Sequence, residues 1–124
     1  MRLVLCLLLA LAAAPAWAEW VKVIENDEYT SYIDPATIRK DGNLRRAWEI
    51  QDLKQRNKDG EMSFRILSEY DCKEERVRTR SFSVHSDPMA LGNTLSNYYG
   101  EPDKWRDIPP GTHVKKTMRI VCAK

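Results

Sequence analysis

Apolar and polar residues alternate through most of the chain after residue 18, and this two-residue period is typical of β-strands that bury one face. The clearest example is the segment 61–72, whose even and odd positions separate into two sets. The even set is Met62, Phe64, Ile66, Ser68, Tyr70 and Cys72, and the odd set is Ser63, Arg65, Leu67, Glu69 and Asp71. The pattern predicts a half-buried strand that delivers Cys72 toward the interior.

Turn signals place further strands before this segment. An Asp-Gly pair precedes residues 44–53 and another follows them, and such pairs between alternating runs favour tight hairpins. One face of this run carries Leu44, Trp48 and Ile50. Upstream, the aromatic and β-branched runs 20–25 and 28–34 predict two strands, and Pro35 ends the second because it lacks a backbone donor. These segments predict an antiparallel meander, with a turn over residues 35–37.

Two segments of the second half are less regular. In residues 76–84 the arginines occupy even positions, as Phe82 and Val84 do, so a flat strand would place charged and apolar side chains on the same face. We therefore expect a strand with a bulge or twist near Arg80. Residues 87–104 combine Pro, Gly and Asn with scattered Leu and Tyr. This mixture predicts a long, partly helical connection rather than a strand.

Both periods fit the last segment, residues 113–122. By twos the apolar pattern includes Val114, Met118 and Ile120, and by helix turns it includes Val114, Met118 and Val121. Thr112 after Gly111 is a suitable N-cap and favours a short helix. Lys115 and Lys116 in the first turn oppose it, because the N-terminal end of the helix dipole is positive.

The first 18 residues have the composition of a secretory signal peptide. A basic start and an apolar run are followed by a small-x-small cleavage site, so we expect cleavage after Ala18 and one exported domain over residues 19–124. The run is shorter than the ~20 residues of a membrane span, and Cys6 is badly placed for lipidation. Losing Arg2 leaves 19 basic and 18 acidic residues, a balance that argues against nucleic-acid binding.

Two cysteines, Cys72 and Cys122, remain after the predicted cleavage. In an oxidising compartment a lone pair of this kind predicts a disulfide. A catalytic thiol or a metal site would need partners at defined spacing, and the sequence has no CxxC and no Cys-His pattern. The bond is therefore expected to be structural.

The sequence contains one candidate binding strip, formed by Arg76, Arg78 and Arg80. Guanidinium groups suit sulfated glycans and acidic protein surfaces, so the strip is a candidate site for polyanions or proteins. The alternative is an exposed strand edge that charge protects from aggregation, and we favour this alternative. Glu74 and Glu75 beside the strip partly cancel its charge.

No catalytic or metal-binding pattern emerges from the sequence. Ser81, Ser83, His85 and Asp87 share one strand face, but same-face positions lie about 6.5–7 Å apart, which we take to exceed nucleophile-to-base hydrogen-bond reach. We therefore expect no catalytic residue. His85 and His113 are the only histidines and lack carboxylates at ligand spacing, so no metal and no cofactor are expected.

The large aromatic residues have two interpretations. They could line a ligand groove, but in a small domain such side chains mostly supply core area. We therefore expect a core role for Trp48, Trp105, Tyr98 and Tyr99.

Taken in order, several landmarks resemble the surface-adhesin protein E-like family of bacterial envelope proteins. They are Trp20, Tyr32-Ile33-Asp34, Ile38, Trp48, Ser63, Asp71-Cys72, Trp105, Ile108-Pro109-Pro110-Gly111-Thr112 and Cys122. The resemblance implies an antiparallel sheet, a C-terminal helix tied to it by the two cysteines, and no catalytic centre. It also implies protein partners, namely host matrix or plasma proteins, and allows a homodimer.

The expected fold is α+β and mainly antiparallel β: a single small meander-type sheet with a short C-terminal helix tied to it by a disulfide. The expected function is that of an exported, non-catalytic envelope protein of a Gram-negative-type bacterium that binds proteins in an adhesin-like way. The alternative is a periplasmic structural or accessory protein with a bacterial envelope partner, and the unlipidated leader favours it. Fold-level analogy does not decide between the two.

Overall fold

The computed structural model describes residues 19–123. Within that range it contains eight strands, two 3₁₀ turns and one α-helix. The strands are β1 (Val21–Glu25), β2 (Tyr29–Ile33), β3 (Arg39–Asp41), β4 (Leu44–Leu53), β5 (Ser63–Asp71), β6 (Arg76–Asp87), β7 (Leu91–Tyr99) and β8 (Arg106–Asp107). The 3₁₀ turns are η1 (Pro35–Thr37) and η2 (Pro88–Ala90), and the helix is α1 (His113–Cys122).

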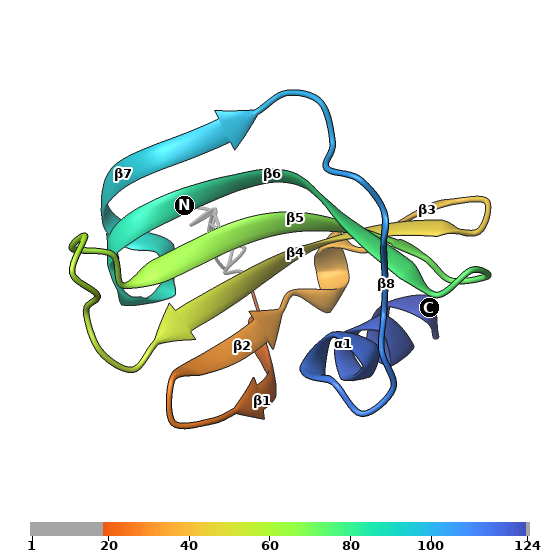
Figure 1. The fold of residues 1–124 in the computed structure, drawn as a ribbon, viewed down its shortest axis with the longest axis horizontal. Coiled ribbons are helices and arrows are strands. Elements are labelled where there is room, and N and C mark those ends of the chain that lie inside the picture. The colour runs from red at the N-terminus through yellow and green to blue at the C-terminus, as the bar shows by residue number, and fades with distance from the viewer. Residues whose placement is uncertain (1–18, 124) are drawn as a thin grey trace, which may run out of the picture.

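All strands belong to one antiparallel sheet (Figure 1). The order along the sheet is β1-β2-β4-β5-β6-β7, with β3 paired to β4 and β8 paired to β6. Consecutive long strands are neighbours, so the predicted meander and the predicted fold class are confirmed. The first Asp-Gly pair lies at the tight turn between β3 and β4, as the sequence indicated, whereas the second lies in the longer connection 54–62 between β4 and β5 and not in a tight hairpin.

The helix α1 packs on one end of one face of the sheet (Figure 1). Thr112 caps its N-terminus by accepting a hydrogen bond from the Lys115 N–H at 3.3 Å, which confirms the predicted cap. Lys115, which sits unfavourably near the positive end of the dipole, forms an ion pair with Glu75. The buried core between the helix and the sheet consists of Val23, Ile33, Ala47, Tyr70, Val77, Ile108, Met118 and Val121.

The predicted disulfide joins the helix to the sheet. Cys72 lies directly after β5 and Cys122 is the last residue of α1, with their Cα atoms 5.8 Å apart. The alternation of residues 61–72 therefore predicted the direction of Cys72 correctly, because this residue faces the side of the sheet on which α1 packs.

The strand β6 contains the bulge that its parity conflict predicted. Ser68 pairs with Thr79 while Leu67 pairs with Ser81, so Arg80 has no partner in the ladder. The bulge places Arg80 on the same side as Arg78. It also lets Phe82 return to the face that the arginines avoid.

The prediction for residues 87–104 was wrong over Leu91–Tyr99, which form the edge strand β7 rather than a connection. All nine residues of this strand are exposed, so its sequence carries no inside-outside alternation to detect. The second residue of the strand, Gly92, has a φ of +74°, and its missing Cβ would lie 2.5 Å from Ser86 Oγ. Glycine therefore marks the start of this strand, not the absence of one.

The predicted signal peptide lies outside the described residues. Within residues 19–123, no helix combines the length and the apolar character needed to cross a membrane.

The disulfide should contribute a large part of the stability. It closes a loop of 50 residues, for which chain entropy gives about 4 kcal/mol. Reduction should therefore lower the melting temperature by about 15 °C or more, measured by circular dichroism with and without reductant. A Cys72→Ala/Cys122→Ala variant should melt where the reduced protein melts and should not respond to reductant. Equal melting temperatures for oxidised and reduced protein would contradict this prediction.

Candidate functional site

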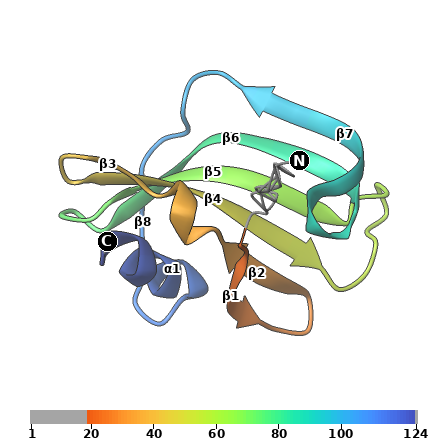
Figure 2. The same cartoon turned by 180° about the vertical axis from the view of Figure 1, so that it is seen from behind.

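The two faces of the sheet differ in chemistry. The helix face, on which α1 packs, carries Tyr70 and Val77, and the back face carries their neighbours Glu69 and Arg78. Seen from behind (Figure 2), η2 lies at the end of the sheet farthest from α1. Three places could serve as sites: a charged cluster on the back face, a polar pocket beside α1, and the apolar edge formed by β7.

The charged cluster is centred on Glu69, which is 0% exposed. Arg46 on β4 and Arg78 on β6 lie directly across from it in the strand register, and each donates from Nε to the carboxylate at 2.7 Å. Arg80 adds Nη1 at 3.3 Å, a contact that the bulge makes possible. The alternation of residues 61–72 placed Glu69 on the face opposite Cys72, where three guanidinium groups allow its burial.

The arginines also decide the titration of this carboxylate. Burial disfavours the charged form of Glu69, but the hydrogen bonds from Arg46 and Arg78, with the charges of Arg78 and Arg80, outweigh it. The pKa of Glu69 is therefore held below its ordinary value.

A second ion pair extends the cluster toward the turn after β5. Arg76 Nη2 lies 2.9 Å from Asp71 Oδ2, and this bond, with the N–H groups of Lys73 and Glu74, lowers the pKa of Asp71. Trp105 lies over the cluster, with its ring centre 4.2 Å from the Arg78 guanidinium carbon and 5.2 Å from that of Arg76. Such cation–π contacts hold the arginine planes in place.

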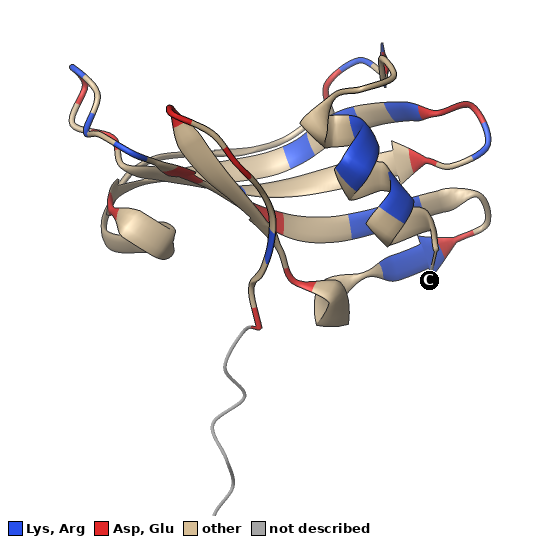
Figure 3. Cartoon of the chain, turned by 90° about the horizontal axis from the view of Figure 1, so that it is seen from below, with Lys and Arg blue, Asp and Glu red and all other residues tan. Residues whose placement is uncertain are grey.

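The predicted strip of Arg76, Arg78 and Arg80 thus shares one face, and Figure 3 shows basic residues on the strands at the end of the sheet where α1 packs. The interpretation of β6 as an exposed edge was wrong, because β6 lies between β5 on one side and β7 and β8 on the other. The arginines are used first of all inside the fold. The strip and Arg46 together place four guanidinium groups around two carboxylates, those of Glu69 and Asp71. The cluster therefore keeps a net positive charge.

The distance argument against a Ser-His contact was wrong. Ser83 Oγ and His85 Nε2 share a hydrogen bond at 2.7 Å, because two side chains on one strand face can lean together and close the spacing between their backbone positions. The other ring nitrogen, Nδ1, is buried and has no hydrogen-bond partner. Burial, and then the charge of Arg65, lower the pKa of His85. The third member that would orient a catalytic histidine does not contact this ring.

A pocket of about 270 Å³ lies on the helix face beside α1. Glu49 lines it and accepts hydrogen bonds from Ser68 Oγ, at 2.6 Å, and from the Tyr70 hydroxyl. Burial raises the pKa of Glu49, and the two hydroxyl donors oppose that effect. Sequence reasoning missed this residue, although its parity with Ala47 places it on the helix face. Among residues 19–123 no group of His, Cys, Asp and Glu is arranged to hold a metal ion.

The edge formed by β7 is the most apolar part of the exposed surface. Five large hydrophobic residues are prominently exposed in the described chain, and four of them lie on β7: Leu91 (64%), Leu95 (46%), Tyr98 (40%) and Tyr99 (73%). The expected core role of Tyr98 and Tyr99 was therefore wrong. Trp48 and Trp105 are partly buried, and each stacks with an arginine.

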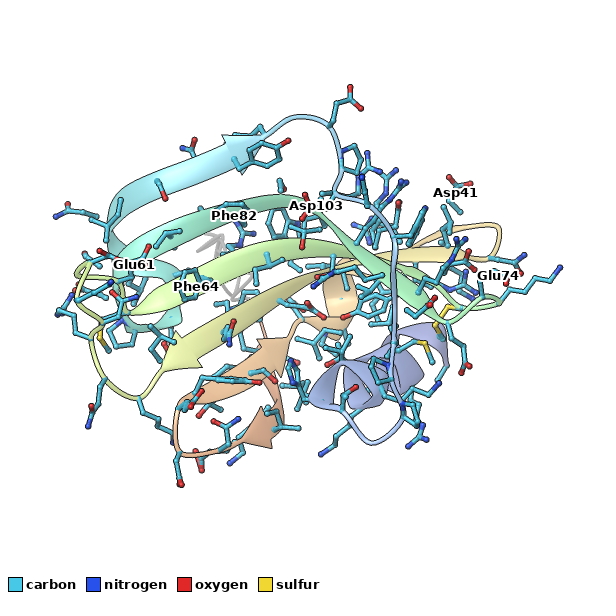
Figure 4. All side chains as sticks on the ribbon, viewed as in Figure 1. Asp41, Glu61, Phe64, Glu74, Phe82 and Asp103 are labelled. Atoms are coloured by element: carbon cyan, nitrogen blue, oxygen red, sulfur yellow. A yellow bond between two sulfur atoms is a disulfide. The ribbon has the colours of Figure 1, made fainter. Side chains whose placement is uncertain are left out.

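The apolar surface continues from the edge onto the helix face. Ile66, Phe82 and Tyr98 lie opposite one another on three successive strands, and the rings of Phe82 and Tyr98 stack with centres 5.8 Å apart. Phe64 and Phe82 lie on the part of the sheet that α1 does not cover (Figure 4). With Ile66 they border a hollow of about 170 Å³.

Replacing Glu69 should show that the charged cluster supports the fold. Glu69→Gln leaves three arginines without a carboxylate, and because these are partly exposed we expect a loss at the low end for broken buried pairs, about 3 kcal/mol at pH 7. The folded pKa is below the unfolded value, so this stabilisation is present above pH 4.5 and is lost as the pH falls through the folded pKa. Denaturant unfolding at pH 7 and pH 3 measures both effects.

The exposed Glu74→Gln variant is the matched control and should unfold like the wild type at both pH values. Equal stability of Glu69→Gln and wild type at pH 7 would mean that the cluster gives no net stabilisation.

Comparisons with known proteins agree with this fold. The selenomethionine form of Haemophilus influenzae protein E is similar at a TM-score of 0.68, with 15% identity over 86% of this chain and 88% of that one. A second crystal form of the same protein gives 0.66, with 15% identity over 86% and 89%. Protein E from non-typeable Haemophilus influenzae gives 0.60, with 16% identity over 90% and 81%. At such identities the likeness establishes the fold alone.

No curated protein matches this chain significantly in sequence. The family model described as Surface-adhesin protein E matches residues 20–123, which is nearly all of the described chain. The match includes both cysteines, the arginine cluster and β7. The chain therefore belongs to the surface-adhesin protein E family.

Proposed function

We propose that the chain is an exported, adhesin-like module of the bacterial envelope that binds other proteins through the surface of β7. The observation that carries the proposal is the gathering of four exposed large hydrophobic side chains on one edge strand. Solvent-exposed apolar groups are normal when scattered, but a contiguous group of this kind marks an interaction site. Aromatic residues such as Tyr98 and Tyr99 are enriched in protein interfaces.

Membership of an adhesin family supports the same proposal. In it the leader is removed after Ala18, the disulfide forms during export, and the domain reaches the periplasm or the cell surface. Host matrix or plasma proteins are the proposed partners. A bacterial envelope partner in the periplasm is the alternative, and either partner could use the β7 surface.

The β7 surface gives a direct test of protein binding. Wild-type protein should bind saturably to at least one member of a panel of immobilised matrix and plasma proteins. A Leu95→Lys/Tyr99→Lys variant should bind that protein about tenfold more weakly or worse, because each lysine replaces an exposed apolar contact with a charge. Surface plasmon resonance measures both affinities.

Val21→Lys is the matched control, because Val21 is the fifth exposed hydrophobic residue and lies on β1, at the opposite edge. It should bind like the wild type. Cells that express the full chain are then treated with external protease: loss of the protein places it at the surface, and protection places it in the periplasm. A folded protein that binds none of the panel and resists the protease would refute the adhesin-like role.

The positively charged cluster is a second candidate surface, for sulfated glycans or acidic proteins. Arg76 and Arg46 keep 36% and 41% of their side chains exposed, so part of the cluster can reach an anion. Replacing Arg78 or Arg80 would strip Glu69 of its partners, so Arg76→Gln is the cleaner variant. It should elute from immobilised heparin at lower salt than the wild type, whereas the exposed Arg39→Gln on β3 should shift elution less. No retention of the wild type at low salt would exclude this second surface.

A further inference from the structure

We propose that the free edge of β7 binds its partner as an added β-strand, and that the partner supplies an extended, uncharged segment with an aromatic or β-branched residue opposite Tyr98. This inference rests on the proposed function and specifies how the β7 surface works. It commits to backbone hydrogen bonds between β7 and the partner, in addition to side-chain contacts.

The edge is free along its whole length. The strand β7 is the last in the sheet, pairs with β6 alone among the described strands, and has all nine residues exposed. Every second N–H and C=O group of such a strand points away from the sheet and has only water as a partner. Figure 1 shows no element beyond β7 on this side.

The edge also lacks the charged side chains by which proteins often prevent strand addition. Residues 88–100 contain no charged side chain, and no other uncharged run after residue 18 exceeds seven residues. The opposite edge strand, β1, carries Lys22 and Glu25 and is interrupted by a bulge at Val23. Charge is a usual protection of an edge, so its presence on β1 and its absence from β7 distinguish the two edges. The register of β7 against β6 shifts on both sides of Thr94, so the regular part of the free edge is Ser96–Tyr99.

The side chains beside the edge indicate what the added strand must carry. The cross-strand row of Ile66, Phe82 and Tyr98 ends at the edge, with Tyr98 as its last member. A fourth strand in register would place one residue beside Tyr98, where aromatic and β-branched side chains pair favourably. The partner's residue at that position would extend the row by one.

Charge determines the rest of the partner's chemistry. The exposed residues of β7 are apolar, hydroxyl-bearing or amide-bearing, and none could neutralise a charged side chain on a neighbouring strand. A charged residue placed against Leu95 or Tyr99 would lose hydration without gaining an ion pair. The fitting segment is therefore uncharged and alternates apolar residues with Ser, Thr or Asn.

The turn before β7 holds the edge in place before binding. Met89 and Ala90 adopt left-handed backbone conformations, with φ of 61° and 59°. Their N–H groups donate at 2.9 Å to Asp52 Oδ1 and to the buried Ser63 Oγ. Such strained residues persist only where the surroundings enforce them, and an edge that is already ordered loses little entropy on binding.

Backbone amide hydrogen exchange, followed by NMR, tests the inference. The probe is an acetylated and amidated peptide of alternating threonine and valine with one central tyrosine. At a concentration ten times its Kd, alternate amides of Leu95–Tyr99 should exchange about tenfold more slowly, while amides of β1 should not change. The same peptide N-methylated at every second residue, on the edge that would face β7, should bind at least about tenfold more weakly.

Three results would overturn the inference. The first is binding of both peptides with equal affinity, or binding of the unmethylated peptide without protection of β7 amides. In either case side chains alone would make the contact. The second is no binding of the unmethylated peptide at any soluble concentration. The third is protection of the same amides in the protein alone as its concentration rises, because a second copy of this chain would then occupy the edge.

These outcomes are distinct from failure of the proposed function. If an immobilised protein partner binds and the Leu95→Lys/Tyr99→Lys variant loses it, while β7 amides stay unprotected in the complex, the binding surface is correct and strand addition is wrong. If the peptide protects β7 but no partner protein binds, the edge is open and the adhesin-like role is wrong.

Discussion

One short helix has to cover a sheet whose longest strand is more than twice its length. The ten residues of α1 span about 15 Å, whereas the twelve residues of β6 span about 40 Å. The helix therefore forms a core at one end of one face only, and its C-terminus is held to the sheet by the Cys72–Cys122 disulfide. Each other surface of the sheet has to be stable without a covering layer.

The back face achieves this with charge. At the end of the sheet where α1 packs, Glu69 is buried among guanidinium groups from β4 and β6, and the indole of Trp105 covers two of the arginines. The long aliphatic parts of the arginines and the stacked ring cover the sheet there. The same side chains that suggested a binding strip in the sequence are thus structural first, and only their exposed parts remain for a partner.

The far end of the sheet is different, because β7 is neither covered nor charged. The uncovered row that ends at Tyr98 and the ordered turn at η2 present a rigid, apolar edge to solvent. In a chain with 31% charged residues, a run of thirteen uncharged positions that includes all nine residues of this edge strand points to contact with another molecule. The family relationship to surface adhesins agrees with that interpretation without specifying the partner.

Local patterns in the sequence determined the elements that alternate or carry a cap: β4 and β5, the bulge at Arg80, the C-terminal helix, and the pairing of two cysteines. Only the tertiary structure decided the edge strand and the sites. A fully exposed strand such as β7 has no alternation to read, and the burial of Glu69 depends on arginines 9 to 23 residues away. Long-range pairing, which no local pattern encodes, set these features.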